Sequence, residues 1–232
     1  MGAGAWSLLG LLAIAVWLLV DRRTNGEEGA RSPGRRHRFP VRDGKAWLVA
    51  LFFALDNLLF YALLSGIAPM YREQGWSASE AGFLLATFTG GVMVGSLVLG
   101  SVSRNEDRRG LLALSGALCV GGMLLVGFAP DVGPFVSVSL VALGVGGGFA
   151  LGMTLPLDNA RDPDEAGVRN AFTLTVGYLV AAAGPVAAGA LRDMTGDFRA
   201  SNGMLLAVSL TLLALCPFLR PRATHVQAAI HT

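Results

Sequence analysis

One acid lies in the middle of a long apolar segment. Asp56, with Asn57 beside it, is near the centre of Ala46–Ala68, whose other residues are almost all apolar. A run of that length spans a bilayer as a helix, so the carboxyl group would lie near the membrane midplane. A charge there costs roughly 2.5–3.5 kcal/mol on insertion scales, and such groups usually face a bundle interior or a water-filled cavity. We therefore expect Asp56 to carry protons or to bind a cation.

Further polar groups follow this acid at helical spacing. Asn57, Tyr61 and Ser65 recur every four residues, so they share one face of the helix. They are interpreted either as hydrogen-bonding groups that lock a bundle or as the lining of a solute pathway. We favour the pathway, because a structural contact needs only an amide or a hydroxyl and not a carboxylate. Other apolar runs add three candidates for the same lining: Thr87, Thr175 and Tyr178.

The sequence carries no constellation that is typical of a catalytic or metal site. Its histidines, His37, His225 and His231, fall outside the apolar runs, and Cys119 and Cys216 lie in separate runs. Motifs of serine hydrolases, zinc proteases and phosphate-binding loops are not found. We expect no enzyme activity, no cofactor and no bound metal.

The composition requires that these side chains be positioned by membrane helices. Hydrophobic residues make up 53% of the chain and charged residues only 15%, which predicts an all-α integral membrane protein. Seven runs approach or exceed the roughly 20 residues that cross a bilayer. They are Ala5–Val20, Ala46–Ala68, Ala81–Val102, Leu111–Ala129, Pro134–Leu157, Ala171–Leu191 and Gly203–Leu219. Within the sixth, Gly184-Pro185 should kink the helix, because proline removes a backbone donor.

The distribution of positive charge predicts the orientation of these spans. Fifteen of the 18 lysines and arginines lie in alternate connections, which the positive-inside rule places in the cytoplasm. The N-terminus would then lie outside and the C-terminus inside, as in a multi-pass protein of the plasma (inner) membrane. Residues 21–45 form a basic cytoplasmic linker and residues 223–232 a cytoplasmic tail. Few aromatic residues interleave with the linker's arginines, so nucleic acid is not the expected partner.

The six spans after the linker, residues 46–222, contain an internal similarity. Gly95-x₄-Gly100 is similar to Gly184-x₄-Gly189, which follows 89 residues later. The spans that contain Trp47 and Phe135 are offset by nearly the same number of residues, 88. An offset of three spans inverts the second copy in the membrane. We therefore predict two inverted three-helix repeats.

Several segments resemble one family of transporters. The segment from Gly177-Tyr178 through Gly184-Pro185 to Thr195-Gly196 resembles the eleventh helix and following loop of major facilitator superfamily transporters. The branch it resembles is that of the cyanate and nitroimidazole transporters. Leu58–Tyr61, Pro69-x-Tyr71 and Gly75–Gly82 are similar to that branch's seventh helix and the loop after it.

A cytoplasmic loop carries part of the superfamily's basic signature. Asp107-Arg108-Arg109 resembles the end of that signature, which implies a gating role for these three residues and for Arg104. The signature's usual aspartate is replaced here by Ser103, which weakens any gating salt bridge that it would make. The branch commonly carries an uncharged polar pair where this chain has Asp56-Asn57. Proton coupling through Asp56 is therefore a hypothesis that the resemblance does not supply.

The resemblance implies a twelve-helix fold in which substrate is held between two six-helix halves. Residues 1–20 would be the sixth helix and residues 46–222 the C-terminal half, so a fragment, a separate half or a second copy must be considered. The implied function is secondary active transport of a small solute by alternating access. An organic anion is the substrate class that the branch implies, with the proton as a candidate partner. The alternative is a non-transporting membrane subunit that docks other proteins through its glycine-rich helix faces.

Overall fold

The computed structural model describes residue 17 and residues 39–103, 107–128 and 133–220. The chain divides into two compact units, residues 1–36 and 37–232, and all helices discussed below belong to the second. The predicted first span, Ala5–Val20, lies outside the described residues except for Trp17, as do most of the linker, Arg104 and the tail.

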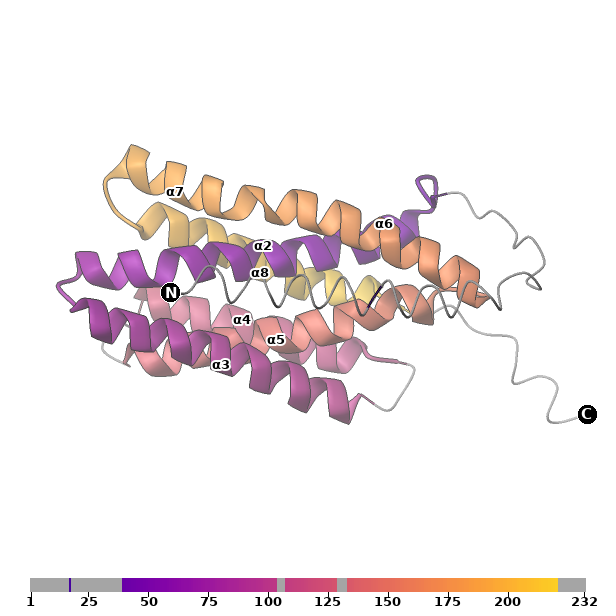
Figure 1. Ribbon diagram of the computed structural model, residues 1–232, viewed down its shortest axis with the longest axis horizontal. Coiled ribbons are helices and arrows are strands. Elements are labelled where there is room, and N and C mark those ends of the chain that lie inside the picture. Colours follow the sequence, from indigo (N-terminus) through magenta and orange to yellow (C-terminus); the bar gives the residue numbers. More distant parts are fainter. Residues whose placement is uncertain (1–16, 18–38, 104–106, 129–132, 221–232) are drawn as a thin grey trace, which may run out of the picture. The chain divides into compact units, whose positions relative to one another are not determined.

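The second unit is built from helices that follow one another along the chain (Figure 1). They are α2 (Gly44–Glu73), α3 (Ala78–Val102), α4 (Arg109–Phe128), α5 (Pro134–Asp158), α6 (Pro163–Ala181), α7 (Ala183–Thr195), α8 (Arg199–Leu215) and the 3₁₀ helix η3 (Cys216–Phe218). Within the described residues, six segments are long and apolar enough to cross a membrane, with α6 and α7 together forming one span and α8 and η3 another. The prediction of membrane-spanning helices is thus confirmed for six of the seven predicted spans.

Helix ends are set by caps that hydropathy does not reveal. The sixth apolar run starts at Ala171, but the helix that contains its first part, α6, begins earlier, at Pro163. The side chain of Asp162 caps it by accepting a hydrogen bond of 2.7 Å from the backbone N–H of Glu165. Proline at the first position and acids in the first turn also favour a helix start. Because these residues are polar, an apolar run could not show them.

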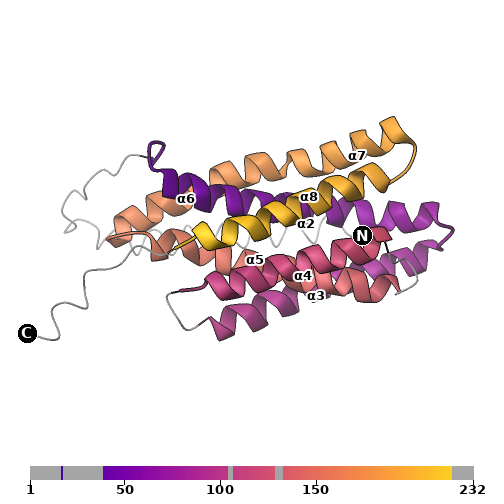
Figure 2. The same ribbon diagram turned by 180° about the vertical axis from the view of Figure 1, so that it is seen from behind.

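Two helices form the centre of the bundle. In the most apolar window of each span, 56% of α2 and 61% of α5 is buried, against 17% of α3. Helix α3 packs along α5, and α6 and α7 follow one another along α2 (Figure 1). Seen from behind, α4 and α8 lie against each other, with α4 also on α5 and α8 also on α2 (Figure 2). The buried acid Asp56 and its neighbour Asn57 both lie on one of these two central helices, α2.

Glycines allow these helices to cross closely. A β-carbon on Gly95 of α3 would overlap the backbone of Leu143 in α5, and one on Gly184 of α7 would lie 2.7 Å from the carbonyl oxygen of Leu58 in α2. Since lipid supplies little hydrophobic drive between helices, such close approach gives the dispersion contacts that hold them together. The α3–α5 and α7–α2 crossings therefore both depend on a glycine.

The sixth span is interrupted within its length. Helix α6 ends at Ala181 and α7 starts at Ala183, with Ala182 between them. Pro185, the third residue of α7, has no N–H to donate to the carbonyl of Ala181 four residues earlier. The interruption therefore lies where the proline removes a helical hydrogen bond.

Candidate functional site

Asp56 lies inside the bundle, between α2 and α5. Its side chain is buried, with 2% of the residue exposed. A β-carbon on Gly148 of α5 would overlap its Oδ1, so the carboxyl group rests against the bare backbone of that helix. The other oxygen, Oδ2, has no hydrogen-bond partner among the described residues. The acid therefore faces the protein interior and not lipid.

Helix α4 contributes polar groups to the same stretch of α5. Ser115 is buried, and its Oγ, which has no hydrogen-bond partner in the described part of the chain, would lie 2.7 Å from a β-carbon on Gly147. The buried thiol of Cys119 lies beside Gly144, one helical turn from Gly148. The described residues contain no group of three or more His, Cys, Asp or Glu side chains that could hold a metal ion. Chemically, the carboxyl group of Asp56 could take up and release a proton.

The polar stripe on α2 runs from the interior to the surface. Asn57 is buried, Tyr61 is half-buried and Ser65 is exposed. The amide of Asn57 donates to the carbonyl oxygen of Phe53 at 2.9 Å, and the hydroxyl of Ser65 donates to that of Tyr61 at 2.9 Å. These hydrogen bonds stay within α2, so they do not lock one helix to another. Exposure of the stripe instead increases from Asn57 to Ser65, and its buried end lies next to Asp56.

The remaining pathway candidates are nearer the surface and separate from Asp56. Thr87 is half-buried and Thr175 exposed, and each hydroxyl bonds a carbonyl of its own helix, at 2.9 and 2.8 Å. Tyr178 is 44% exposed and meets Phe53 of α2 edge-on, with ring centroids 5.9 Å apart. The structure thus separates a buried acid from a set of partly exposed hydroxyls. Ser115 could not be identified from sequence, since a lone serine in an apolar run gives no distinctive signal.

The predicted gating residues form two different contacts. Arg108 pairs with Asp158 at the end of α5, Nε to Oδ2 at 2.9 Å, and its guanidinium also donates to the carbonyl and hydroxyl oxygens of Ser103. Asp107 and Arg109 pair with each other, at 2.6 Å. Hydrogen bonds from Arg109 lower the pKa of Asp107 to about 2. Among the predicted gating residues that the structure describes, Arg108 is the one whose ion pair ties the loop to another helix.

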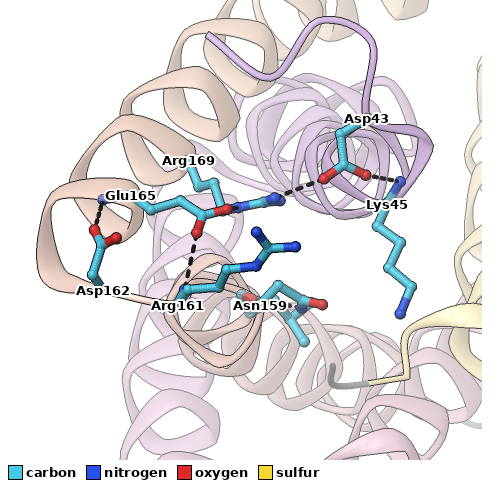
Figure 3. A network of polar contacts seen from close by, with 8 residues as sticks. Asp43, Lys45, Asn159, Arg161, Asp162, Glu165 and Arg169 are labelled. Atoms are coloured by element: carbon cyan, nitrogen blue, oxygen red, sulfur yellow. Dashed lines mark hydrogen bonds and ion pairs between the residues drawn. The ribbon is translucent and has the colours of Figure 1, made fainter. Parts of the chain in front are cut away.

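An ion-pair network joins the start of α2 to α6 at the same end of the bundle. Arg169 is buried on α6, where its guanidinium contacts Asp43 at 2.6 Å and Glu165 at 2.8 Å. Figure 3 shows the arginine lying between the two acids, with the backbone N–H of Arg161 also donating to Glu165. Asp43 is the N-cap of α2. Sequence reasoning missed this network, because 126 residues separate Asp43 from Arg169.

A matching ion pair lies at the opposite end. Arg192 of α7 donates to Glu73 at the end of α2, with its Nε at 2.9 Å, and it also contacts Asp193. Both ends of α2 are thus tied to the sixth span, by Asp43 with Arg169 and by Glu73 with Arg192.

Comparison with known proteins identifies related chains. Residues 1–185 and 54–230 match the family model of the Major Facilitator Superfamily. The cyanate transport protein CynX of Escherichia coli (strain K12) is 31% identical over 196 residues, which cover 83% of this chain and 50% of that protein. The 2-nitroimidazole transporter of the same strain is 27% identical over 213 residues, covering 89% and 53%. These relatives confirm the resemblance to the cyanate and nitroimidazole branch.

A third relative extends the set to another bacterium. The uncharacterized transporter YycB of Bacillus subtilis (strain 168) is 23% identical over 213 residues, which cover 89% of this chain and 52% of that protein. The chain spans about half the length of the curated relatives it matches.

Proposed function

Because this multi-pass membrane chain belongs to the Major Facilitator Superfamily, we propose that it acts as the C-terminal half of a secondary active transporter. The half would move a small solute across the plasma membrane by alternating access. The observation that carries this proposal is the family match, which spans the six membrane helices. In this fold, substrate lies between two six-helix halves. A further half, encoded with this chain, separately or as a second copy, would complete the pathway.

The six helices are best explained as two inverted repeats, α2–α4 and α5–α8. Leu58 of α2 packs against Gly184 of α7, and Leu143 of α5 packs against Gly95 of α3. The two leucines are 85 residues apart in the sequence. Glu73 and Asp158, which end α2 and α5, are also 85 residues apart, and each pairs with an arginine of another element. Equivalent contacts at one offset support the repeat, with its two ion pairs at opposite faces of the membrane.

The charge distribution supports an orientation in which the end that holds Arg108 and Arg169 faces the cytoplasm. The end that holds Glu73 and Arg192 would then face outward. The described arginines and lysines are more numerous at the first end, where the linker also enters. The polar stripe of Asn57, Tyr61 and Ser65 would accordingly open toward the outside and lead inward to the acid.

Asp56 is proposed as the proton carrier of this transporter. The carboxyl group is buried, and no cation among the described residues pairs with it. An ionised carboxylate without a partner is strongly disfavoured in such a place, so the packed arrangement fits the neutral acid. Loss of the proton would drive the group toward water. Because Oδ1 rests on Gly148, that movement would loosen the α2–α5 contact and couple protonation to helix packing.

The alternative of a docking subunit has less support. The glycine faces considered for docking are used inside the bundle. A β-carbon on Gly144 would meet Cys119, one on Gly148 would meet Asp56, and one on Gly152 would lie 3.4 Å from Phe53. Faces that are already covered by neighbouring helices are not free to bind another protein.

The substrate class follows from the relatives, whose names specify cyanate and 2-nitroimidazole. Both are small polar molecules, one of them an anion, and we propose a small solute of this kind. The test is uptake into proteoliposomes that hold the chain, produced from its gene together with the DNA directly upstream of Met1. That DNA would supply a preceding half if one is encoded there.

Uptake of a panel of small organic anions and azoles is measured with and without an imposed proton gradient. Saturable uptake that depends on the gradient, and that Asp56→Asn uncouples from it, is the expected result. Thr211→Ala serves as the control, because this exposed hydroxyl of α8 bonds only a carbonyl of its own helix. Uptake no greater than that of protein-free liposomes for every solute would overturn the proposal.

A further inference from the structure

A cavity of about 690 Å³ lies away from the proposed pathway, at the end of the bundle where α2 and α4 end and α8 begins. Its walls include Met70 of α2, Met123 of α4 and Leu206 of α8. A smaller cavity of about 50 Å³ adjoins it and shares Met70 and Asn202 with it. None of the pathway candidates lines either cavity, so this is a separate site. Its volume is in the range of ligand sites.

The cavity arises because α4 and α8 separate toward this end. The two helices are close where Gly116 faces Leu213, since a β-carbon on that glycine would lie 3.1 Å from the leucine backbone. Leu213 lies near the end of α8, so this close contact is away from the end at which α8 begins. Gly127 and Gly203 line the cavity, and a β-carbon on either would have no atom within 4 Å. The space is therefore left by backbone divergence and by missing side chains.

The chemistry of the walls changes along the membrane normal. Glu73, Asp197 and Arg199 lie at the helix ends, where lipid headgroups are found. Leu206 is seven residues further along α8 than Arg199, about 10 Å deeper at 1.5 Å per residue, and Met123 and Met70 line the same apolar part. A ligand that fills the whole space must have a polar head at the interface and an apolar body in the hydrocarbon region. That description fits a phospholipid.

The charged groups at the rim specify the headgroup. The side chain of Arg199 is 94% exposed, and its Nε lies 3.9 Å from Asp197, too long for a hydrogen bond. Its N–H groups are therefore available for a phosphate, while the half-exposed carboxylate of Asp197 can accept from an ammonium group. Glu73 is already engaged by Arg192.

We propose that this cavity binds a zwitterionic aminophospholipid, with an acyl chain between α4 and α8, its phosphate at Arg199 and its ammonium at Asp197. The proposal requires that the chain span a membrane, and it does not depend on the proposed transport. A phospholipid wedged there would fill the space that α4 and α8 leave between them at this end of the bundle.

The experiment uses native mass spectrometry of the purified, delipidated full chain titrated with phosphatidylethanolamine, phosphatidylcholine or phosphatidylglycerol. Phosphatidylethanolamine should bind most tightly, because a trimethylated ammonium has no N–H to donate and a glycerol head has no cation. Gly203→Phe and Gly127→Phe fill the cavity from opposite walls and should abolish this binding. Gly90→Phe is the matched control, since that glycine of α3 is also exposed and free of neighbours but lies outside the cavity.

A second variant tests the headgroup assignment by itself. Asp197→Asn should weaken phosphatidylethanolamine by about fivefold, as expected for a partly exposed charge pair, and phosphatidylcholine by less, because its ammonium has the charge but no N–H to donate. Equal lipid retention by the cavity-filling variants and by Gly90→Phe would overturn the site. Equal affinity of the unmodified chain for the three lipids would overturn the assignment of the ammonium to Asp197. Uptake assays have no part in either readout, so failure here is distinguishable from failure of the proposed transport.

Discussion

Asp56 of α2 and Gly148 of α5 meet so closely that no side chain larger than hydrogen fits between them, because a β-carbon at position 148 would overlap Oδ1 of the acid. The contact joins the two most buried helices of the bundle at Asp56, whose buried side chain can ionise. Helix packing and the state of one carboxyl group are therefore linked at a single point.

Gly148→Ala should destabilise the protein. The added methyl group must displace the carboxyl of Asp56 or separate the helices, and such overpacking costs about 1–3 kcal/mol. The free energy of unfolding is measured by SDS titration in mixed micelles. Gly152→Ala is the control on the same face of α5, where the nearest atom would be at an ordinary 3.4 Å. Equal stability of the two variants would show that the Asp56–Gly148 contact is not tight.

Cys119 provides a reporter for movement at Asp56. The chain has two cysteines, so Cys216→Ala leaves this buried thiol alone. If ionisation of Asp56 loosens the α2–α5 contact, alkylation of Cys119 should accelerate from neutral to alkaline pH more than thiol ionisation alone explains. Asp56→Asn in the same background keeps Cys119 as the single thiol and should lack the extra acceleration. Parallel pH profiles for the two proteins would rule out the coupling.

Arg169→Ala should lower the free energy of unfolding by about 1–3 kcal/mol, since it leaves Asp43 and Glu165 without their shared partner in a largely buried site. Arg169→Lys should restore only part of the loss, because an ammonium group cannot present the two separate edges that the guanidinium uses. SDS titration again gives the values. Arg161→Ala is the control, since its hydrogen bond to Glu165 comes from the backbone. A loss from Arg161→Ala as large as that from Arg169→Ala would contradict the role of the buried network.

Asp107 should contribute nothing to the pH dependence of transport. Its pKa is about 2 in the folded protein, below the value of about 3.9 for an unperturbed aspartate. Any stability from its pair with Arg109 is therefore present above about pH 4 and is lost as pH falls through about 2. Uptake profiles between about pH 5 and pH 8 should have the same shape in Asp107→Asn as in the unmodified protein. A changed shape would place a titrating group in this loop.

The six described spans, and the place of Asp56 within one of them, could be predicted from sequence, because hydrophobic length is a property of consecutive residues. The exposure of each residue in the polar stripe beside it could not be predicted. Asn57, Tyr61 and Ser65 share a face of α2 as their spacing predicts, but only the packed bundle shows that the face passes from buried to exposed. In the sequence, Arg169 is one more charge between two apolar runs, and its burial depends on a helix start set by the cap at Asp162.

The sequence by itself determined which segments enter the membrane and that an acid is carried among them. Only the tertiary structure decided what that acid touches and which distant charges pair, as Asp43 does with Arg169. The physical reason is that the free energy of transferring a helix into lipid is a sum over the residues of that helix. The partner of a side chain depends instead on where glycines let two helices cross, and that is fixed jointly by segments far apart in the chain.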